Sequence, residues 1–264
     1  MTGGLRGIRS LDALGAFDAF DALGSLGSLG SRDESATELM DDPAADLAML
    51  ERTYDRFRLV NVVVSNMRAV YRRWIRPRLS PTRTCRVLDI GTGAADVPRA
   101  LLAWARADGV RLEVVAIDPD PRALDWALRQ PAEPGLSLRR VSSRELAVAG
   151  DRFDVVMSNH VLHHLDGREF GELLADSERL TAESGVAVHC DIERSRLGYA
   201  GFALGTWPFA GNLLAGSYIR ADGLTSIRRS HTAAELAASL PPGWRVRRGF
   251  PSRLEVFWSA DAAS

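Results

Sequence analysis

The feature that most constrains this chain is a short apolar run that ends in a glycine turn. The segment reads Arg86-Val-Leu-Asp-Ile-Gly-Thr-Gly-Ala-Ala-Asp96, and a helical pattern follows it. Gly91 and Gly93 allow a sharp backbone turn and the close approach of a ligand, because a Cβ atom would collide there. The segment therefore predicts the strand, turn and helix of a nucleoside site. A glycine pair alone is weak evidence, because plain turns share it.

The rest of the chain alternates short apolar runs with helical runs, which predicts a mainly parallel sheet with helices on both faces. We expect a Rossmann-like, seven-stranded α/β domain over residues 81–264, preceded by an N-terminal helical cap over 41–80. In the cap, Asp42 and Pro43 indicate the start of a helix. The predicted strands are 86–90, 113–117, 137–141, 153–158, 185–190, 244–248 and 253–258. The predicted helices of the domain are 95–108, 121–130, 160–179 and 231–240.

Residues 1–40 are biased towards Leu, Gly, Ser, Asp and Ala. Such a segment buries too little apolar surface to offset its ordering entropy, so we expect a mobile tail. A weak amphipathic helix over residues 10–24 is the alternative. Acidic residues interrupt the apolar run after Arg6 and Arg9, so no signal peptide is predicted. Met40 opens a more ordinary sequence and is a candidate alternative start.

Composition favours a small molecule as the partner. The formal net charge is −1 and the pI is about 6.5, so no global charge attracts nucleic acid. All 33 basic residues are arginine, as in GC-rich bacterial genomes, so lysine chemistry is excluded. Cys85 and Cys190 are far apart, which fits neither a metal motif nor a disulfide framework. A reducing cytoplasm is the expected location.

Two acidic residues, Asp89 and Asp96, distinguish this site from a dinucleotide-binding site. Asp89 stands at the end of the first predicted strand, where a carboxylate repels a pyrophosphate but attracts an ammonium group. Asp96 stands where the dinucleotide fingerprint has a small residue. These two acids argue against the main alternative, an NAD-dependent oxidoreductase. Asp118 ends the second predicted strand, 25 residues after Gly93, and can accept hydrogen bonds from both ribose hydroxyls.

With these motifs, residues 86–191 resemble the class I S-adenosylmethionine-dependent methyltransferases. The resemblance implies S-adenosylmethionine as the cofactor and a small-molecule acceptor of the quinone or polyketide kind. It implies that the methionine end approaches the first motif, formed by Asp89, Gly91, Thr92 and Gly93, and that Asp118 and Pro119 hold the ribose. A non-catalytic relative that keeps the cofactor fold is a further alternative.

The later motifs add three expected cofactor contacts. Where the family often has an acid and an alanine near the adenine, this chain has Val141-Ser142-Ser143, which leaves Ser142 as the expected contact. Ser158 and Asn159 end the fourth predicted strand, at the sheet edge where α/β proteins bind ligands. The sequence after them lacks the Asn/Asp-Pro-Pro-Tyr/Phe pattern of nucleic-acid methyltransferases, so no nucleic acid is expected.

Three histidines follow the fourth strand at helical spacing, so His160, His163 and His164 can share one helical face. They can pack or cap the helix, or act as a general base, with His160 nearest the strand end. A third interpretation is a metal site, because in the quinone O-methyltransferases that the segment resembles, Glu, Glu and His hold a divalent ion at matching positions. Three histidines would suit Zn²⁺ better than Mg²⁺, but we expect no metal. His189 and Asp191, at the end of the fifth strand, are further candidates.

An apolar, glycine-rich segment follows the fifth strand. It is long enough to span a bilayer, but five glycines between residues 197 and 219 make it a poor spanning helix. We expect an apolar lid over about 197–230 that covers an apolar, aromatic acceptor, methylated at oxygen or carbon; contact with a membrane surface stays open. The aromatic residues that could stack on the acceptor, or pack in the core, are Tyr199, Phe202, Trp207 and Phe209.

Overall fold

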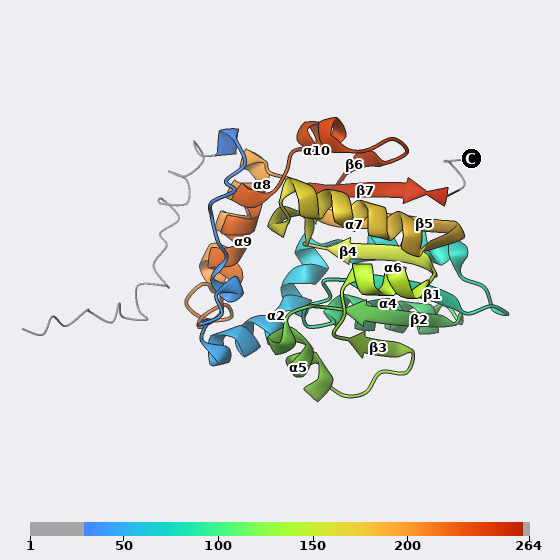
Figure 1. The fold of residues 1–264 in the computed structure, drawn as a ribbon. Coiled ribbons are helices and arrows are strands. Elements are labelled where there is room, and N and C mark those ends of the chain that lie inside the picture. Colours follow the sequence, from blue (N-terminus) through green and yellow to red (C-terminus); the bar gives the residue numbers. More distant parts are fainter. Residues whose placement is uncertain (1–28, 261–264) are drawn as a thin grey trace, which may run out of the picture.

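The computed structural model describes residues 29–260 (Figure 1). One sheet of seven strands runs in the order β3-β2-β1-β4-β5-β7-β6. Strands β1 to β5 are parallel to one another. Strand β7 pairs with β5 in the antiparallel direction, and β6 pairs with β7 in the antiparallel direction. The strands are β1 (Cys85–Ile90), β2 (Leu112–Ile117), β3 (Leu136–Arg139), β4 (Phe153–Asn159), β5 (Thr181–Ile192), β6 (Arg245–Gly249) and β7 (Arg253–Ser259). The predicted Rossmann-like sheet is confirmed.

Helices cover both faces of the sheet. Alternate residues of β1 point to opposite sides, so Val87 packs in a core cluster with α4 while Leu88 packs in a second cluster with α6, α7 and α10. The α-helices are α2 (Leu47–Val64), α3 (Met67–Val70), α4 (Asp96–Ala107), α5 (Pro121–Arg129), α6 (Ser143–Ala149), α7 (Gly167–Leu180), α8 (Arg196–Thr206), α9 (Ile219–Arg229) and α10 (Ala233–Ser239). The short helical turns are η3 (Leu39–Asp41), η4 (Tyr71–Ile75), η5 (Arg76–Arg78), η6 (Leu162–His164) and η7 (Trp207–Phe209).

Two predicted helix starts are wrong. Helix α2 begins at Leu47 rather than after Asp42, because the Asp46 side chain accepts the Met49 N–H and caps the helix. The predicted helix over 160–179 is broken at its first turn, because His160 adopts a left-handed conformation with φ 61°. After the η6 turn, the Asp166 carboxylate caps a new helix, α7.

Residues 29–40, expected to belong to a mobile tail, are packed against the domain. The Arg32 guanidinium donates hydrogen bonds to the carbonyl oxygens of His163 and Leu165, at 3.1 and 2.9 Å. Glu38 is only 5% exposed. These partners lie far away in the sequence, so the local composition gave no sign of them. The expectation for residues 1–28, including the helix over 10–24, lies outside the described residues.

The segments outside the sheet gather at one end of it. In Figure 1, residues 29–46, α2, α8 and α9 lie together at the carboxyl ends of β1, β2 and β4. The expected lid region is therefore helical, built from α8, the η7 turn and α9. Within residues 29–260, no helix combines the length and apolar character that crossing a membrane requires.

Candidate active site

A cavity of about 750 Å³ opens at the carboxyl ends of β1, β2 and β4. Its walls come from the glycine turn 91–93, the loop before α5, the loop after β4, the η3 segment and α9. Eight of the nine residues predicted to bind the cofactor line this one cavity: Asp89, Gly91, Thr92, Gly93, Asp118, Pro119, Ser142 and Asn159.

The glycine turn has the geometry that the sequence motif predicts. Gly91 and Gly93 have φ angles of 70° and 54°, in the left-handed region that favours glycine. A Cβ atom on Gly91 would lie 2.6 Å from Cγ2 of Val161. A Cβ atom on Gly93 would meet no atom within 4 Å and would point into open space. Ligand atoms can therefore approach the backbone closely at Gly93.

Carboxylates surround this turn. Burial, together with smaller contributions from the neighbouring Asp96 and Asp118 carboxylates, raises the pKa of Asp89 to about 7. Burial also raises the pKa of Asp118, whose two oxygens accept the N–H groups of Asp120 at 2.9 Å and Gly93 at 2.7 Å. A cationic group beside these side chains would stabilise their charged forms. The acidic turn therefore suits a ligand with an ammonium or sulfonium charge.

Ser158 lies apart from the cavity, contrary to expectation. It is fully buried, and its Oγ lies 2.9 Å from Nδ1 of His189. Nε2 of His189 lies 3.0 Å from Oγ of Ser177, and its ring stacks on Trp244. Burial lowers the pKa of His189 to about 3. His189 is therefore a neutral side chain of the sheet interior, so the expectation that it lines the active site is wrong.

Ser142 lines the cavity and is the N-cap of α6. Its Oγ accepts the Glu145 N–H, while the Glu145 carboxylate accepts the Ser142 N–H in return. This capping box holds the loop after β3 in place beside the cavity.

His160 lines the cavity directly after β4. Its Nε2 lies 2.8 Å from Oγ of Ser65 and 3.5 Å from the guanidinium of Arg253, and its Nδ1 lies 3.8 Å from Asp191. Burial lowers the pKa of His160 below its usual value of 6.5; Asp191 opposes this shift and Arg253 adds to it. The imidazole is therefore neutral at neutral pH and can accept a proton.

His163 lies between two carboxylates. Its Nδ1 is 2.8 Å from Asp191, and its Nε2 is 3.1 Å from Oε1 of Glu38. Burial disfavours the charged ring, but the two carboxylates outweigh burial and raise the pKa of His163 to about 10. Burial likewise opposes the charge on Glu38, but His163 and its other partners lower the Glu38 pKa to about 2.

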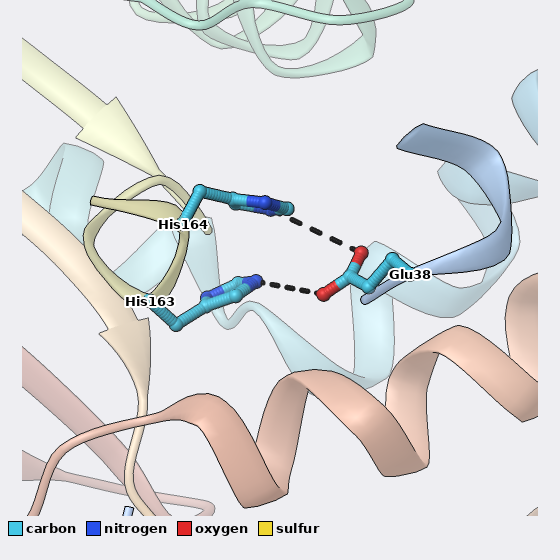
Figure 2. A group of neighbouring side chains, drawn as sticks. All are labelled: Glu38, His163 and His164. Carbon is cyan, nitrogen blue, oxygen red and sulfur yellow. Dashed lines mark hydrogen bonds and ion pairs between the residues drawn. The ribbon is translucent and has the colours of Figure 1, made fainter. Parts of the chain in front are cut away.

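His164 reaches the same carboxylate from its neighbouring position. Its Nε2 lies 3.9 Å from Oε2 of Glu38, and its Nδ1 lies 3.2 Å from Asp41. Figure 2 shows the rings of His163 and His164 side by side, each directed at one oxygen of Glu38. The three histidines do not share a helical face as predicted, but all three line the cavity.

Two residues at the site, Glu38 and Asp41, were not predicted from the sequence. Glu38 and Asp41 lie in and beside the biased N-terminal stretch, and no local pattern marks them as site residues. Asp222 of α9 accepts the N–H groups of Leu39 at 2.8 Å and Met40 at 3.0 Å, which fixes the η3 segment over the cavity.

Only one of the four predicted stacking aromatics reaches the cavity. Phe202 of α8 lines it, together with Ile219 of α9. Tyr199 is buried in a separate core cluster. Trp207 and Phe209 are 54% and 46% exposed at the surface. The lid therefore offers the cavity one aromatic ring rather than a stack of four.

A comparison with known protein families identifies the family of this chain. Residues 63–237 match the family described as "Methyltransferase domain", which is more than half of the chain. The chain belongs to this methyltransferase family. The acidic glycine turn suits the positive charges of S-adenosylmethionine.

The methyltransferase is 29% identical over 124 residues to a ubiquinone biosynthesis O-methyltransferase of Azorhizobium caulinodans, which covers 46% of each chain. It is 37% identical over 83 residues to the release factor glutamine methyltransferase of Salmonella typhimurium, which covers 30% of this chain and 28% of the relative. It thus spans less than half the length of these curated relatives.

Two solved structures share the fold. Human N-acetylserotonin methyltransferase, in complex with S-adenosylmethionine, has a TM-score of 0.60 at 12% identity, covering 94% of this chain and 69% of that chain. The plantazolicin methyltransferase BpumL, in complex with S-adenosylhomocysteine, has a TM-score of 0.55 at 11% identity, covering 90% of this chain and 96% of that chain.

Proposed function

We propose that this methyltransferase methylates a hydroxyl group of an apolar, aromatic small molecule, quinone-like or polyketide in kind, with a carbon acceptor as the alternative. The observation that carries the proposal is the neutral His160 imidazole on the wall of the cavity that the glycine turn also lines. Phe57, Leu173 and Phe202 give the cavity apolar walls. The ubiquinone biosynthesis O-methyltransferase relative supports oxygen as the acceptor atom.

In this proposal the cofactor lies along the carboxyl edge of β1 and β2. Asp89 faces the ammonium group of the methionine end, and the backbone of 91–93 allows the close approach that the cofactor needs. Asp118 and Pro119 hold the ribose. Ser142 lies at the adenine end, and Asn159 borders the methionine end. Ser158 is not included, because its side chain is occupied within the sheet.

The chain's own residues position the acceptor and take up its proton. S-adenosylmethionine supplies an electrophilic methyl carbon on its sulfonium and leaves as S-adenosylhomocysteine. The acceptor oxygen attacks this carbon in line, the carbon–sulfur bond breaks, and the sulfur keeps the electron pair. The hydroxyl proton passes to the His160 imidazole. Ser65 and Asp191 hold that ring in place.

The cap and lid form the acceptor side of the cavity in this proposal. The 41–80 cap contributes Tyr54 and Phe57, and the lid over about 197–230 contributes Phe202 and Ile219. Cys85 and Cys190 are free and buried, which fits the proposed cytoplasmic location.

Turnover of S-adenosylmethionine with a panel of acceptors tests the proposed function. We expect methylation of phenols or hydroquinones with apolar substituents. In the His160→Gln variant, kcat should fall by about 100- to 10,000-fold while the cofactor Kd is unchanged. His231→Gln is the matched control, since His231 lies outside this cavity. Turnover of polar amines or nucleic acid alone, or an undiminished kcat in His160→Gln, would refute the proposal.

A further inference from the structure

We propose that Glu38, His163 and His164 bind a divalent transition-metal ion, best matched by Zn²⁺, at the acceptor side of the cavity. This site differs from the three-histidine set that the sequence allowed, since the ring centre of His160 lies 6.5 Å from that of His163 and, within residues 29–260, only Glu38, His163 and His164 have ligand atoms that converge. The existence of the ion site is independent of the proposed function, whereas its role in methyl transfer rests on that function.

The three ligand atoms converge in space. Nε2 of His163 lies 3.1 Å from Oε1 of Glu38, Nε2 of His164 lies 3.9 Å from Oε2, and the ligand atoms of the three residues lie within 4.8 Å of one another (Figure 2). Ligands of a tetrahedral Zn²⁺ lie about 3 to 4 Å apart, because each is about 2.0–2.2 Å from the ion. Small side-chain adjustments would therefore be enough to admit an ion.

Both histidines have the outer partner that is typical of metal-binding histidines. The Nδ1 atom of His163 is held by Asp191 at 2.8 Å, and the Nδ1 atom of His164 by Asp41 at 3.2 Å. A carboxylate on Nδ1 fixes the ring orientation and retains the Nδ1 proton, so that Nε2 can bind a metal in place of its own proton. The same arrangement on two adjacent rings, both directed at one carboxylate, points to a built site.

The charge and position of the cluster also favour an ion. Three carboxylates, from Glu38, Asp41 and Asp191, lie beside the two imidazoles. Arg229 lies 3.9 Å from Asp41, and a divalent cation would bind in place of the proton between His163 and Glu38. Two imidazoles and one carboxylate suit Zn²⁺, whereas Mg²⁺ prefers an all-oxygen set. All three ligands line the cavity. Three protein ligands leave a coordination position for water or an acceptor oxygen.

A role in catalysis follows from this open position. An acceptor hydroxyl bound to the ion would have a lowered pKa and a fixed orientation. Its proton would then pass to His160, which lines the same cavity.

Metal content and metal affinity test the inference without relying on activity. The whole chain, prepared without a histidine tag, is analysed by plasma mass spectrometry, and Zn²⁺ is titrated calorimetrically into chelator-treated protein. We expect equimolar, saturable Zn²⁺ binding and no comparable binding of Mg²⁺. X-ray absorption of the loaded protein should show two imidazole ligands and oxygen. A folded chain that binds no Zn²⁺ would overturn the inference.

Variants separate this site from its neighbours. Glu38→Gln and His164→Asn should abolish saturable binding, and Asp41→Asn should weaken it by about 10- to 100-fold. His160→Asn and His231→Asn, the matched controls, should keep the parent affinity. Circular dichroism selects the variants that fold, and His164→Asn alone decides the question if Glu38→Gln does not. Unchanged affinity in His164→Asn contradicts the site.

The same preparations distinguish this inference from the proposed function. Methylation of a hydroxyl acceptor by chelated, metal-free protein at the full rate would overturn the catalytic role of the ion and leave the proposed function intact. Saturable Zn²⁺ binding without turnover of any hydroxyl acceptor would leave the ion site intact and contradict the proposed function.

Discussion

Replacing Asp89 by asparagine should stabilise the cofactor-free protein in a pH-dependent way. Asp89 is 2% exposed, and burial raises its pKa from 3.8 to about 7. A change of that size corresponds to about 4 kcal/mol, since each tenfold change in proton affinity is about 1.4 kcal/mol. Between pH 3.8 and about 7, the folded protein keeps a proton that the unfolded chain has released. The free energy of unfolding therefore falls as the pH rises through this window.

Asparagine removes this titration. The variant and the parent protein should differ little in stability near pH 4. Above pH 7 the variant should be more stable by about 2 to 4 kcal/mol, because structural relaxation moderates the cost of a buried charge. Urea denaturation of cofactor-free protein over this pH range measures the difference. Asp125→Asn, at an exposed position of α5, is the control and should change the free energy of unfolding by no more than about 0.5 kcal/mol.

The same Asp89→Asn variant should bind the cofactor more weakly, although it is more stable without it. If Asp89 meets the ammonium group of S-adenosylmethionine, its loss removes a charge-assisted hydrogen bond of about 1.5–3 kcal/mol, and the Kd should rise by about 10- to 100-fold. A variant that is no more stable than the parent at pH 8, or whose advantage does not depend on pH, would refute the electrostatic reasoning. Unchanged cofactor affinity would refute the assigned role.

Three further predictions address the rest of the site. Gly91→Ala should lower the free energy of unfolding by about 1–3 kcal/mol, because a φ of 70° is strained for alanine and the alanine Cβ would lie 2.6 Å from Val161. Urea denaturation measures this change, and a free energy of unfolding equal to that of the parent protein would contradict it. Gly223→Ala would place a Cβ atom 2.3 Å from the Phe202 ring, so the KM for the acceptor should rise by about 10-fold while the Kd of the cofactor stays the same. An unchanged KM in steady-state kinetics would contradict the assignment of Phe202 to the acceptor side of the cavity. The acid limb of the kcat/KM profile should lie below pH 6.5, since the lowered pKa of His160 keeps the base neutral above that value, and a limb above pH 7 would argue against His160.

The local motifs predicted the fold because they depend on neighbouring residues. The strand ending in Asp89 and the glycine turn are fixed by apolar residues and φ preferences within one short segment. The strand ending before Asp118 is similarly local. Both acids therefore lie where the sequence suggested, beside the same cavity.

The parts that were not predicted depend on distant partners. Glu38 meets His163 across 125 positions of the sequence, and nothing near Glu38 indicates that contact. The spacing of the histidines resembles a helix, yet the left-handed His160 and the Asp166 cap divide the segment into two elements. The prediction that Ser158 contacts the cofactor was wrong, because successive residues of a strand point to opposite faces of the sheet. The Ser158 side chain points to the face where it meets His189.

Calorimetric titration of the purified protein with S-adenosylmethionine, and separately with NAD, tests the cofactor site most directly, particularly when repeated on Asp118→Ala. We predict saturable binding of the sulfonium nucleoside, no heat with NAD, and weakened binding in the variant, because Asp118 would hold the ribose. Binding of NAD together with indifference to S-adenosylmethionine would contradict the account.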